Sequence, residues 1–225
     1  MAKPTIIETP CPFCEKDIKV PYYENVDIAK DPSIKKQILS REFFSFKCPH
    51  CESVIPTVGP LLYHDTAVPT MIYLIPEGYD QSLDNFNQLL ALVRKDNNDT
   101  PMTYTSRIVP TVDRLIEKIH IQDAHLDDRC VELLKMAYLK HYAEQLQKNG
   151  TIRDILFMPS GEENDAQIIF LLSTEEGSNV ASIDFSVELY HHFETTYAEA
   201  LKNENAENFQ NIDGQWAADF LKAQQ

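Results

Sequence analysis

The 225-residue chain has a formal net charge of -15 and a hydrophobic content of 43%, a composition that excludes disordered and fibrous proteins. Residues 1–8 lack the apolar stretch of a signal peptide, and the longest apolar run, residues 168–172, is far too short to span a bilayer. We therefore expect a cytoplasmic protein with no membrane segment, in which clustered cysteines bind metal rather than form disulfides.

The negative charge is concentrated in the last third of the chain. Residues 149–225 hold 14 acidic and 3 basic residues, whereas residues 1–70 are nearly neutral. An acidic segment repels phosphate backbones, which argues against nucleic-acid binding by the chain as a whole. The same segment is suited to a protein partner with a basic surface.

Two Cys-Pro-x-Cys turns near the N-terminus are each flanked by predicted strands. The strands are residues 5–10 and 17–23 around Cys11-Pro-Phe-Cys14, and residues 44–47 and 53–58 around Cys48-Pro-His-Cys51. Alternation of apolar and polar residues supports the strand that leaves the first turn. Between the two hairpins, Asp31 is suited to cap a short helix that begins at Pro32, because proline fits the first helical turn.

The middle and the end of the chain contain further predicted strands and helices. A hairpin (61–65 and 70–74), a strand (107–109) and three helices (82–95, 112–119 and 126–147) precede Gly150. Three strands (152–157, 166–172 and 181–185) and two helices (187–203 and 215–223) follow it. This order indicates an α+β fold: an N-terminal zinc-ribbon-like β module with an inserted short helix, then helices, then a C-terminal three-stranded sheet with helices.

One structural zinc ion is predicted near the N-terminus. Its ligands are Cys11, Cys14, Cys48 and Cys51. Four thiolates form the tetrahedral ligand set of structural zinc sites and leave no open position for catalysis. Nearby lysines can partly offset the negative charge of the thiolates: Lys16, Lys19 and Lys47. Two alternatives stay open, an iron–sulfur cluster with the same ligands and a pair of redox motifs, although neither motif opens a helix in a βαβ unit.

The paired turns, about 35 residues apart with a helix between them, resemble the CpXC domain family. The similarity continues in five further segments: residues 60–65, 71–77, 107–109, 115–119 and 126–129. It covers roughly residues 5–135. The resemblance implies a prokaryotic protein with a zinc ribbon, but it implies no catalytic residues, because the family is a domain of unknown function.

The resemblance also implies a division of the chain. Residues 1–147 would form a CpXC-like domain, with a zinc-ribbon-like portion at about 5–70 and a helical portion at 80–147. Residues 148–225 would form an acidic α+β segment.

One departure from common zinc-binding turns concerns Glu15 and Glu52. Each follows the second cysteine of its turn, where zinc knuckles often place glycine because the backbone is left-handed. A left-handed residue other than glycine costs on the order of 1 kcal/mol. The departure affects the expected geometry of the turns and leaves the identity of the ligands unchanged.

Several other reactive residue types have a structural interpretation. Cys130 lies on the apolar stripe of its helix and is expected to be a buried free thiol. His50 is expected to point outward from its turn. The aromatic residues around His191-His192 recur at helical spacing and are expected in the core: Tyr190, Phe193 and Tyr197.

Two groups that contain histidine are candidates for a further site. His64 and Asp65 are adjacent in a predicted strand, so they face opposite sides of the sheet and do not form a dyad by themselves. His120, Asp123 and His125 lie in a predicted connector, where they could approach one another and bind a second metal.

The sequence favours a non-enzymatic protein-interaction or adaptor protein with a structural zinc ion. No Gly-x-Gly, Walker or Gly-x-Ser-x-Gly motif is present. The expected partner is another protein with a basic surface. Two alternatives remain: an enzyme with a site around His64 and Asp65 or at His120–His125, and a protein that binds nucleic acid through its zinc ribbon.

Overall fold

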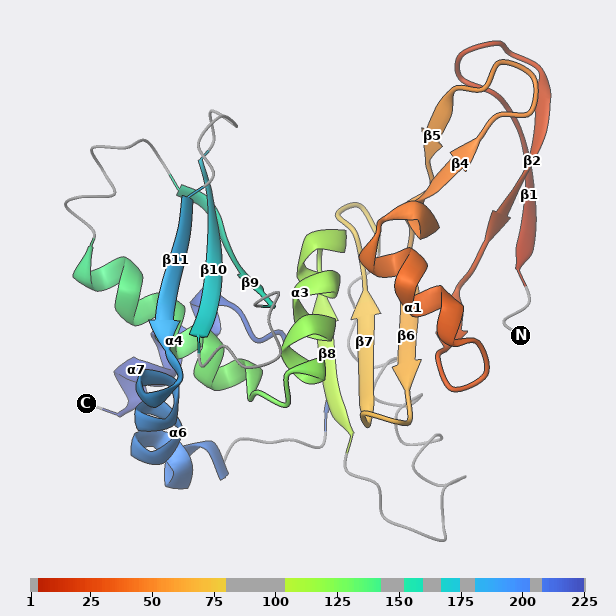
Figure 1. The fold of residues 1–225 in the computed structure, drawn as a ribbon. Coiled ribbons are helices and arrows are strands. Elements are labelled where there is room, and N and C mark those ends of the chain that lie inside the picture. The colour runs from red at the N-terminus through yellow and green to blue at the C-terminus, as the bar shows by residue number, and fades with distance from the viewer. Residues whose placement is uncertain are drawn as a thin grey trace, which may run out of the picture. The chain divides into compact units, whose positions relative to one another are not determined.

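The computed structural model describes residues 4–79, 104–142, 152–159, 167–174, 181–202 and 208–224. Its helices and several sheets form a mixed α+β fold, as predicted (Figure 1). The chain separates into two compact units. The N-terminal unit comprises residues 1–116 and 207–209, and the C-terminal unit comprises residues 117–206 and 210–225. The division into a CpXC-like domain and an acidic segment near residue 147 stays a prediction.

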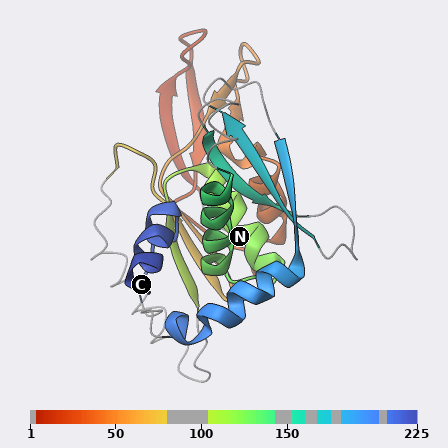
Figure 2. The same cartoon turned by 90° about the vertical axis from the view of Figure 1, so that its left-hand side faces the viewer.

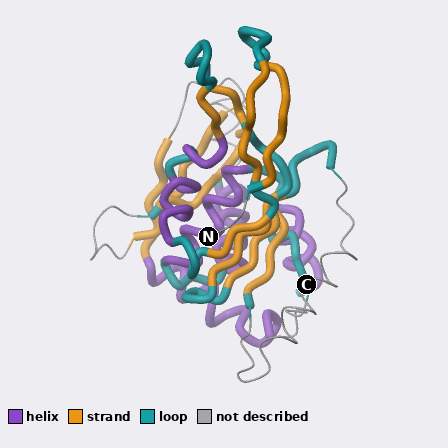
Figure 3. The backbone as a smooth tube through the Cα atoms, turned by 90° about the vertical axis from the view of Figure 1, so that its right-hand side faces the viewer, coloured by secondary structure: helices purple, strands orange, loops and turns teal. Residues whose placement is uncertain are grey.

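Two antiparallel hairpins carry the cysteine turns of the N-terminal unit, and both are visible in Figure 3. β1 (Thr5–Pro10) pairs with β2 (Asp17–Tyr22), and β4 (Ser45–Lys47) pairs with β5 (Val54–Pro56). Among the described residues, each hairpin is a two-stranded sheet of its own. Buried and exposed residues alternate along most of β2, which confirms the pattern expected of that strand.

A four-stranded mixed sheet completes the strands of the N-terminal unit. Its order is β3 (Asn25–Asp27), β6 (Leu61–Asp65), β7 (Thr70–Leu74) and β8 (Thr105–Val109). β6 and β7 form the predicted antiparallel hairpin, whereas β3 with β6 and β7 with β8 pair in parallel. The sequence does not predict β3, because three residues are too few for a periodic pattern and the strand forms only by pairing with β6.

Helix α1 (Pro32–Leu39) begins where it is predicted. The Asp31 side chain accepts a hydrogen bond from the backbone N–H of Ser33 at 3.3 Å, so Asp31 caps the helix. The apolar face of α1 is buried, and Figure 1 shows the helix in front of β6. An ion pair between Lys35 and Asp65, at 3.4 Å, joins α1 to the end of that strand.

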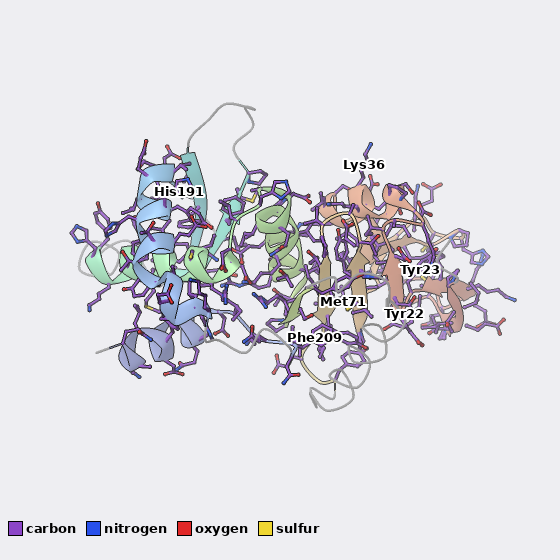
Figure 4. The ribbon with its side chains drawn as sticks, turned by 90° about the horizontal axis from the view of Figure 1, so that it is seen from below. Tyr22, Tyr23, Lys36, Met71, His191 and Phe209 are labelled. Atoms are coloured by element: carbon purple, nitrogen blue, oxygen red, sulfur yellow. The ribbon has the colours of Figure 1, made fainter. Side chains whose placement is uncertain are left out.

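The opposite face of the four-stranded sheet holds a small cluster of Met71, Tyr104 and Phe209. Figure 4 labels Met71 and Phe209, which lie close together although they are far apart in the sequence. The Phe209 ring also meets the ring of Tyr73 edge-on, with 6.5 Å between the ring centroids. A segment near the C-terminus therefore belongs to the N-terminal unit.

The C-terminal unit combines a three-stranded antiparallel sheet with helices (Figure 2). Its strands, in the order β11-β10-β9, are β9 (Ile152–Met158), β10 (Gln167–Thr174) and β11 (Ala181–Ser186). Its helices are α4 (Asp128–His141), α6 (Val187–Lys202) and α7 (Gly214–Ala223). Helix α3 (Val112–Asp123) belongs to this unit from Glu117 onward. The core includes Cys130, Leu134, Phe170, Tyr190 and Phe220. These elements match the predicted three strands and closing helices.

Two helix boundaries differ from the prediction, and one short helix is additional to it. α3 continues to Asp123, beyond the expected end at residue 119. α4 begins at Asp128, after the Asp127 side chain caps it by accepting from the backbone N–H of Arg129. A short 3-10 helix, η1 (Glu42–Phe44), was not expected. The predicted helix at 82–95 and the end of the predicted helix at 126–147 lie outside the described residues.

Candidate metal centre

The two hairpins bring the four predicted cysteines together. The sulfur atoms of Cys11, Cys14, Cys48 and Cys51 all lie within 4.8 Å of one another. Between the turns, Cys11 Sγ is 3.8 Å from Cys51 Sγ, and Cys14 Sγ is 3.9 Å from Cys48 Sγ. A tetrahedral zinc ion with Zn–S bonds of about 2.3 Å requires sulfurs about 3.8 Å apart. The four cysteines therefore fit a single tetrahedral metal ion.

The two cysteine turns have the same backbone geometry. In each turn the N–H of the first cysteine donates to the carbonyl five residues later: Cys11 to Lys16 and Cys48 to Ser53, both at 2.9 Å. The residue after the second cysteine donates back to the first, at 2.9 Å from Glu15 and 3.0 Å from Glu52. Glu15 and Glu52 both have a φ of 61°, the left-handed conformation expected at these positions.

The pKa values of two of the four thiols are shifted in opposite directions. Hydrogen bonds with the side chain and backbone of Ser53 lower the pKa of Cys51 to about 6. A backbone hydrogen bond at Lys16 lowers the pKa of Cys14, but partial burial and the neighbouring sulfurs outweigh it and raise this pKa to about 12. The two thiols therefore differ in how readily each loses its proton in the absence of a metal.

Residues 5–58, which we call the metal-binding module after their four candidate ligands, have few other buried apolar side chains around the cysteines. Cys11 and Cys48 are each 1% exposed and pack with Ile18 and Val20. Partly buried Phe46 and Ile55 add to this cluster from the second hairpin. Because so little apolar surface joins the hairpins here, the cysteines and their ion would supply much of the connection between them.

Two of the three lysines predicted to offset the thiolate charge, Lys19 and Lys47, are engaged by carboxylates. Lys19 pairs with Glu8 at 2.9 Å, and Lys47 pairs with Glu52 at 3.0 Å. All four side chains are exposed, so these pairs add little to stability. The expected offset of the thiolate charge by Lys19 and Lys47 is therefore weaker than the sequence suggests.

His64 and Asp65 do not form a dyad, because they face opposite sides of β6, as predicted. The His64 Nε2 atom is 3.1 Å from the Tyr104 hydroxyl, and His64 is the cross-strand neighbour of Asp27. Asp65 turns toward the other face, where it accepts a hydrogen bond from the Tyr63 hydroxyl at 3.3 Å. Partial burial lowers the pKa of His64.

The connector proposed for a second metal is partly helical. His120 and Asp123 belong to the last turns of α3, and His125 follows with a left-handed φ of 55°. Among the described residues, the four N-terminal cysteines are the only group of three or more histidine, cysteine or acidic residues spaced for a metal. The second-metal alternative is therefore not supported.

The remaining candidates have the structural roles expected of them. Cys130 is fully buried, and burial raises the pKa of its thiol to about 12. His50 is exposed, and its backbone N–H donates to the Cys48 sulfur at 3.4 Å. Tyr190 is buried in the core of the C-terminal unit, and Phe193 and Tyr197 pack against that core.

The sequence does not predict a buried charge cluster between α3 and α4. Its members, each at most 2% exposed, are Glu117, Lys118, Asp128, Glu132 and Lys135. Lys118 Nζ lies 2.8 Å from Asp128 Oδ2. Lys135 Nζ lies 2.8 Å from Glu132 Oε1 and also contacts Glu117. Each lysine thus has a carboxylate partner inside the C-terminal unit.

The cluster has a sequence pattern that normally signals an exposed surface. Asp128, Glu132 and Lys135 lie at helical positions i, i+4 and i+7, so they share one face of α4. Charges of both signs on one helix face usually indicate contact with solvent. The sequence gives one weak indication that charged residues are buried here: Glu117 and Lys118 interrupt the apolar residues of α3.

Comparison with known proteins identifies the family. None of the helices in the described parts of the chain is long and apolar enough to cross a bilayer. No curated protein and no solved structure matches the chain significantly. The family model described as CpXC protein matches residues 9–135, which include all four cysteines and more than half of the chain. The chain therefore belongs to the CpXC family.

Proposed function

We propose that the four cysteines hold one structural zinc ion in a zinc-ribbon arrangement, and that the protein is a non-enzymatic interaction or adaptor protein. The observation that carries the metal assignment is the spacing of the four sulfurs, which suits one ion with no open position. A multi-iron cluster would place several atoms between its thiolates and would hold them farther apart.

Elemental analysis of the protein purified without added metal tests this assignment. We expect one zinc ion per chain, and in the cobalt-substituted protein the visible absorption bands of a tetrahedral thiolate site. Cys48→Ser should lose the metal, whereas Cys130→Ala should keep it, because Cys130 lies in the other unit. Iron in place of zinc, or a metal retained by Cys48→Ser, would contradict the proposal.

The exposed apolar side chains of the metal-binding module support an interaction role. Those of residues 5–58 are Ile6, Ile7, Phe13, Val54 and Val58, with exposed fractions between 43% and 62%. They make up most of the large exposed hydrophobic side chains in the described chain. A concentration of exposed apolar side chains within one small module supports a protein-binding role for that module.

Crosslinking in the native host, with variants of this surface, tests the interaction role. Phe13→Ser combined with Val54→Ser should keep the metal and abolish a stoichiometric crosslinked partner. Leu189→Ser is the matched control, because Leu189 is exposed but lies in the C-terminal unit. If the double variant crosslinks as well as the wild-type protein, or if no stoichiometric partner appears, the adaptor role is wrong.

The two alternative functions have less support. Nucleic-acid binding through the zinc ribbon would need a basic surface, but residues 1–70 carry 8 basic and 9 acidic residues, and Lys19 and Lys47 lie beside carboxylates. An enzymatic site at His64 and Asp65 would need both groups on one side of β6, and they lie on opposite sides.

A further inference from the structure

One edge of the first hairpin is open to a further strand. Among the described residues β1 pairs only with β2, so within that part of the chain one of its edges has no backbone partner (Figure 1). Ile6 and Ile7 are 52% and 44% exposed, although they are adjacent and face opposite sides of the strand. β1 therefore exposes apolar side chains on both of its faces beside an open edge, a combination that favours the addition of a strand.

The register of the hairpin shows which backbone groups lie at that edge. The Cys11 N–H donates to the Lys16 carbonyl at 2.9 Å, so these two residues form a hydrogen-bonded pair. Hydrogen-bonded and non-hydrogen-bonded pairs alternate along an antiparallel ladder, which places Ile6 and Glu8 in non-hydrogen-bonded pairs. The backbone N–H and carbonyl groups of Ile6 and Glu8 therefore point away from β2, toward the open edge.

Prolines limit both edges of the hairpin. By the same alternation Pro21 occupies an outward position of β2, so that edge lacks one N–H donor and is less suited to a further strand. Pro4, just before β1, and Pro10, at its end, also occupy outward positions. Because proline has no backbone N–H, the outward donors from Pro4 to Pro10 are those of Ile6 and Glu8 alone. An added strand must match this short pattern.

We propose that β1 of a second copy of this chain occupies the open edge, antiparallel to the first and related to it by a twofold axis at Ile7. In this register Ile6 of each copy lies opposite Glu8 of the other, so every outward N–H of these residues meets a carbonyl. Pro4 of each copy lies opposite Pro10 of the other, where neither residue has a donor to lose. The edge of β1 is therefore complementary to itself.

The side chains support the same register. Ile7 lies opposite Val20 of β2, which is buried in the cluster around the cysteines. The two copies of Ile7 would meet at the axis and extend this apolar row from one chain into the other. Moving the axis to Glu8 would instead place two carboxylates directly opposite each other, which is unfavourable. Moving it to Ile6 would place Glu8 opposite Pro4, which has no N–H for the Glu8 carbonyl.

The charge of this part of the chain is compatible with self-association. Glu8 forms an ion pair with Lys19 of its own chain at 2.9 Å, and residues 1–70 carry 8 basic and 9 acidic residues. The two copies would thus meet through a nearly neutral segment. Because β1 has only six residues, we expect a weak dimer, at the low end of the interface areas of about 1,200–2,000 Å² that stable complexes bury. The inference rests on the interaction role proposed for the metal-binding module and names a second copy of the chain as one partner.

Sedimentation equilibrium of the full-length, zinc-loaded protein tests the dimer. We expect a monomer–dimer equilibrium with a dissociation constant of about 1–100 μM. Raising the salt concentration from about 0.05 M to 0.5 M should strengthen the dimer, because each chain carries a net charge of -15 and salt screens the repulsion between the two. A protein that stays monomeric up to about 1 mM, or a dimer that salt dissociates, would overturn the inference.

Backbone variants test the edge itself. Glu8→Pro removes an outward N–H but no hydrogen bond between β1 and β2, so it should keep the zinc ion and weaken dimerisation by about tenfold or more. Glu8→Ala, which keeps the N–H, should change dimerisation by less than about threefold. Lys19→Pro is the matched control, because Lys19 lies opposite Glu8 and its N–H points to the outer edge of β2. Dimerisation that survives Glu8→Pro, or that Lys19→Pro weakens equally, would contradict the proposed edge.

Charge variants test the position of the twofold axis. Ile7→Lys and Ile7→Glu should each be monomeric alone, because like charges would meet directly opposite each other. An equimolar mixture of the two proteins should form mixed dimers, in which opposite charges meet at the axis. If either variant dimerises alone as well as the wild-type protein, or if the mixture stays monomeric, the proposed register is wrong.

The dimer and the proposed adaptor role can fail separately. Phe13→Ser combined with Val54→Ser should still dimerise, because neither residue lies in β1. A monomeric protein whose crosslinking to another protein still depends on Phe13 and Val54 would overturn only the dimer. A dimer that shows no such crosslinking would overturn only the adaptor role.

Discussion

Glu15 and Glu52 occupy equivalent positions in the two cysteine turns, and both have a left-handed backbone with a φ of 61°. Each donates its N–H to the carbonyl of the first cysteine of its turn. Their side chains differ, because Glu52 pairs with Lys47 at 3.0 Å, whereas Glu15 forms no ion pair within the described chain. The backbone geometry of these turns thus does not require glycine, but it is strained without it.

Replacing Glu15 by glycine should stabilise the metal-binding module. Relief of the left-handed strain should raise the free energy of unfolding by about 1 kcal/mol, less the entropy that glycine adds to the unfolded chain. Glu52→Gly should gain less stability than Glu15→Gly, because the variant also loses the exposed ion pair with Lys47. Native-state hydrogen exchange in the zinc-loaded protein measures both effects, in β1 and β2 for Glu15→Gly and in β4 and β5 for Glu52→Gly. A destabilised Glu15→Gly variant would contradict this account of the turn.

Removal of the metal should loosen the N-terminal hairpins before the rest of the protein. After chelation, or in Cys48→Ser, the amides of β1, β2, β4 and β5 should lose protection, because few apolar contacts hold these hairpins together. The strands of the C-terminal unit should keep their protection. Hydrogen exchange followed by mass spectrometry resolves the two groups, and equal loss in both would show that the metal supports the whole chain.

Loss of one lysine from the buried charge cluster should be strongly destabilising. Lys135→Met leaves the carboxylates of Glu117 and Glu132 without this partner, which should lower the free energy of unfolding by about 3–5 kcal/mol. The matched control is Lys140→Met on the same helix, because Lys140 is exposed and should change stability by less than about 0.5 kcal/mol. Urea denaturation at neutral pH compares the two variants. Similar denaturation midpoints for the two variants would mean that the buried charge cluster contributes little to the stability of the protein.

The pH dependence of stability should include a contribution from His64. Partial burial lowers the pKa of His64 in the folded protein, against the opposing effect of Asp27 and Asp65. The unfolded chain, with a histidine pKa of about 6.5, therefore binds this proton more tightly than the folded protein. The stability contributed by neutral His64 is fully present above pH 6.5, the unfolded pKa. It is lost as the pH falls from there through the lower pKa of the folded protein.

Comparison of variants isolates this contribution. Thermal denaturation between about pH 5 and 8 should show a smaller loss of stability on acidification for His64→Gln than for the wild-type protein. His191→Gln serves as the control, since the His191 side chain is 60% exposed. Parallel pH profiles for His64→Gln and the wild-type protein would rule out this role.

Thiol labelling should distinguish Cys130 from the other four cysteines. In the chelated but folded protein, the four cysteines of the metal-binding module should react with a thiol reagent, because the hairpins that bury them have loosened. Cys130 is fully buried with a pKa raised to about 12, so it should react only when the C-terminal unit unfolds. Counting labelled thiols before and after denaturant checks this, and five reactive thiols before denaturant would contradict it.

Much of the fold is encoded in local patterns that can be read along the chain. Asp31 before Pro32 marks the start of α1, because a cap needs only the next few residues. Alternation in β6 is sufficient to place His64 and Asp65 on opposite faces. The predicted helix at 82–95 lies outside the described residues and stays a prediction.

By itself, the sequence determined the four cysteine positions, the order of most strands and helices and the expected left-handed residues, because each depends on spacing within one turn or one element. Only the tertiary structure decided which sulfurs meet across the hairpins, that β3 pairs with β6 and that Lys135 is buried. Each of these depends on a contact between segments distant in the chain, and no local pattern distinguishes a buried charged helix face from an exposed one.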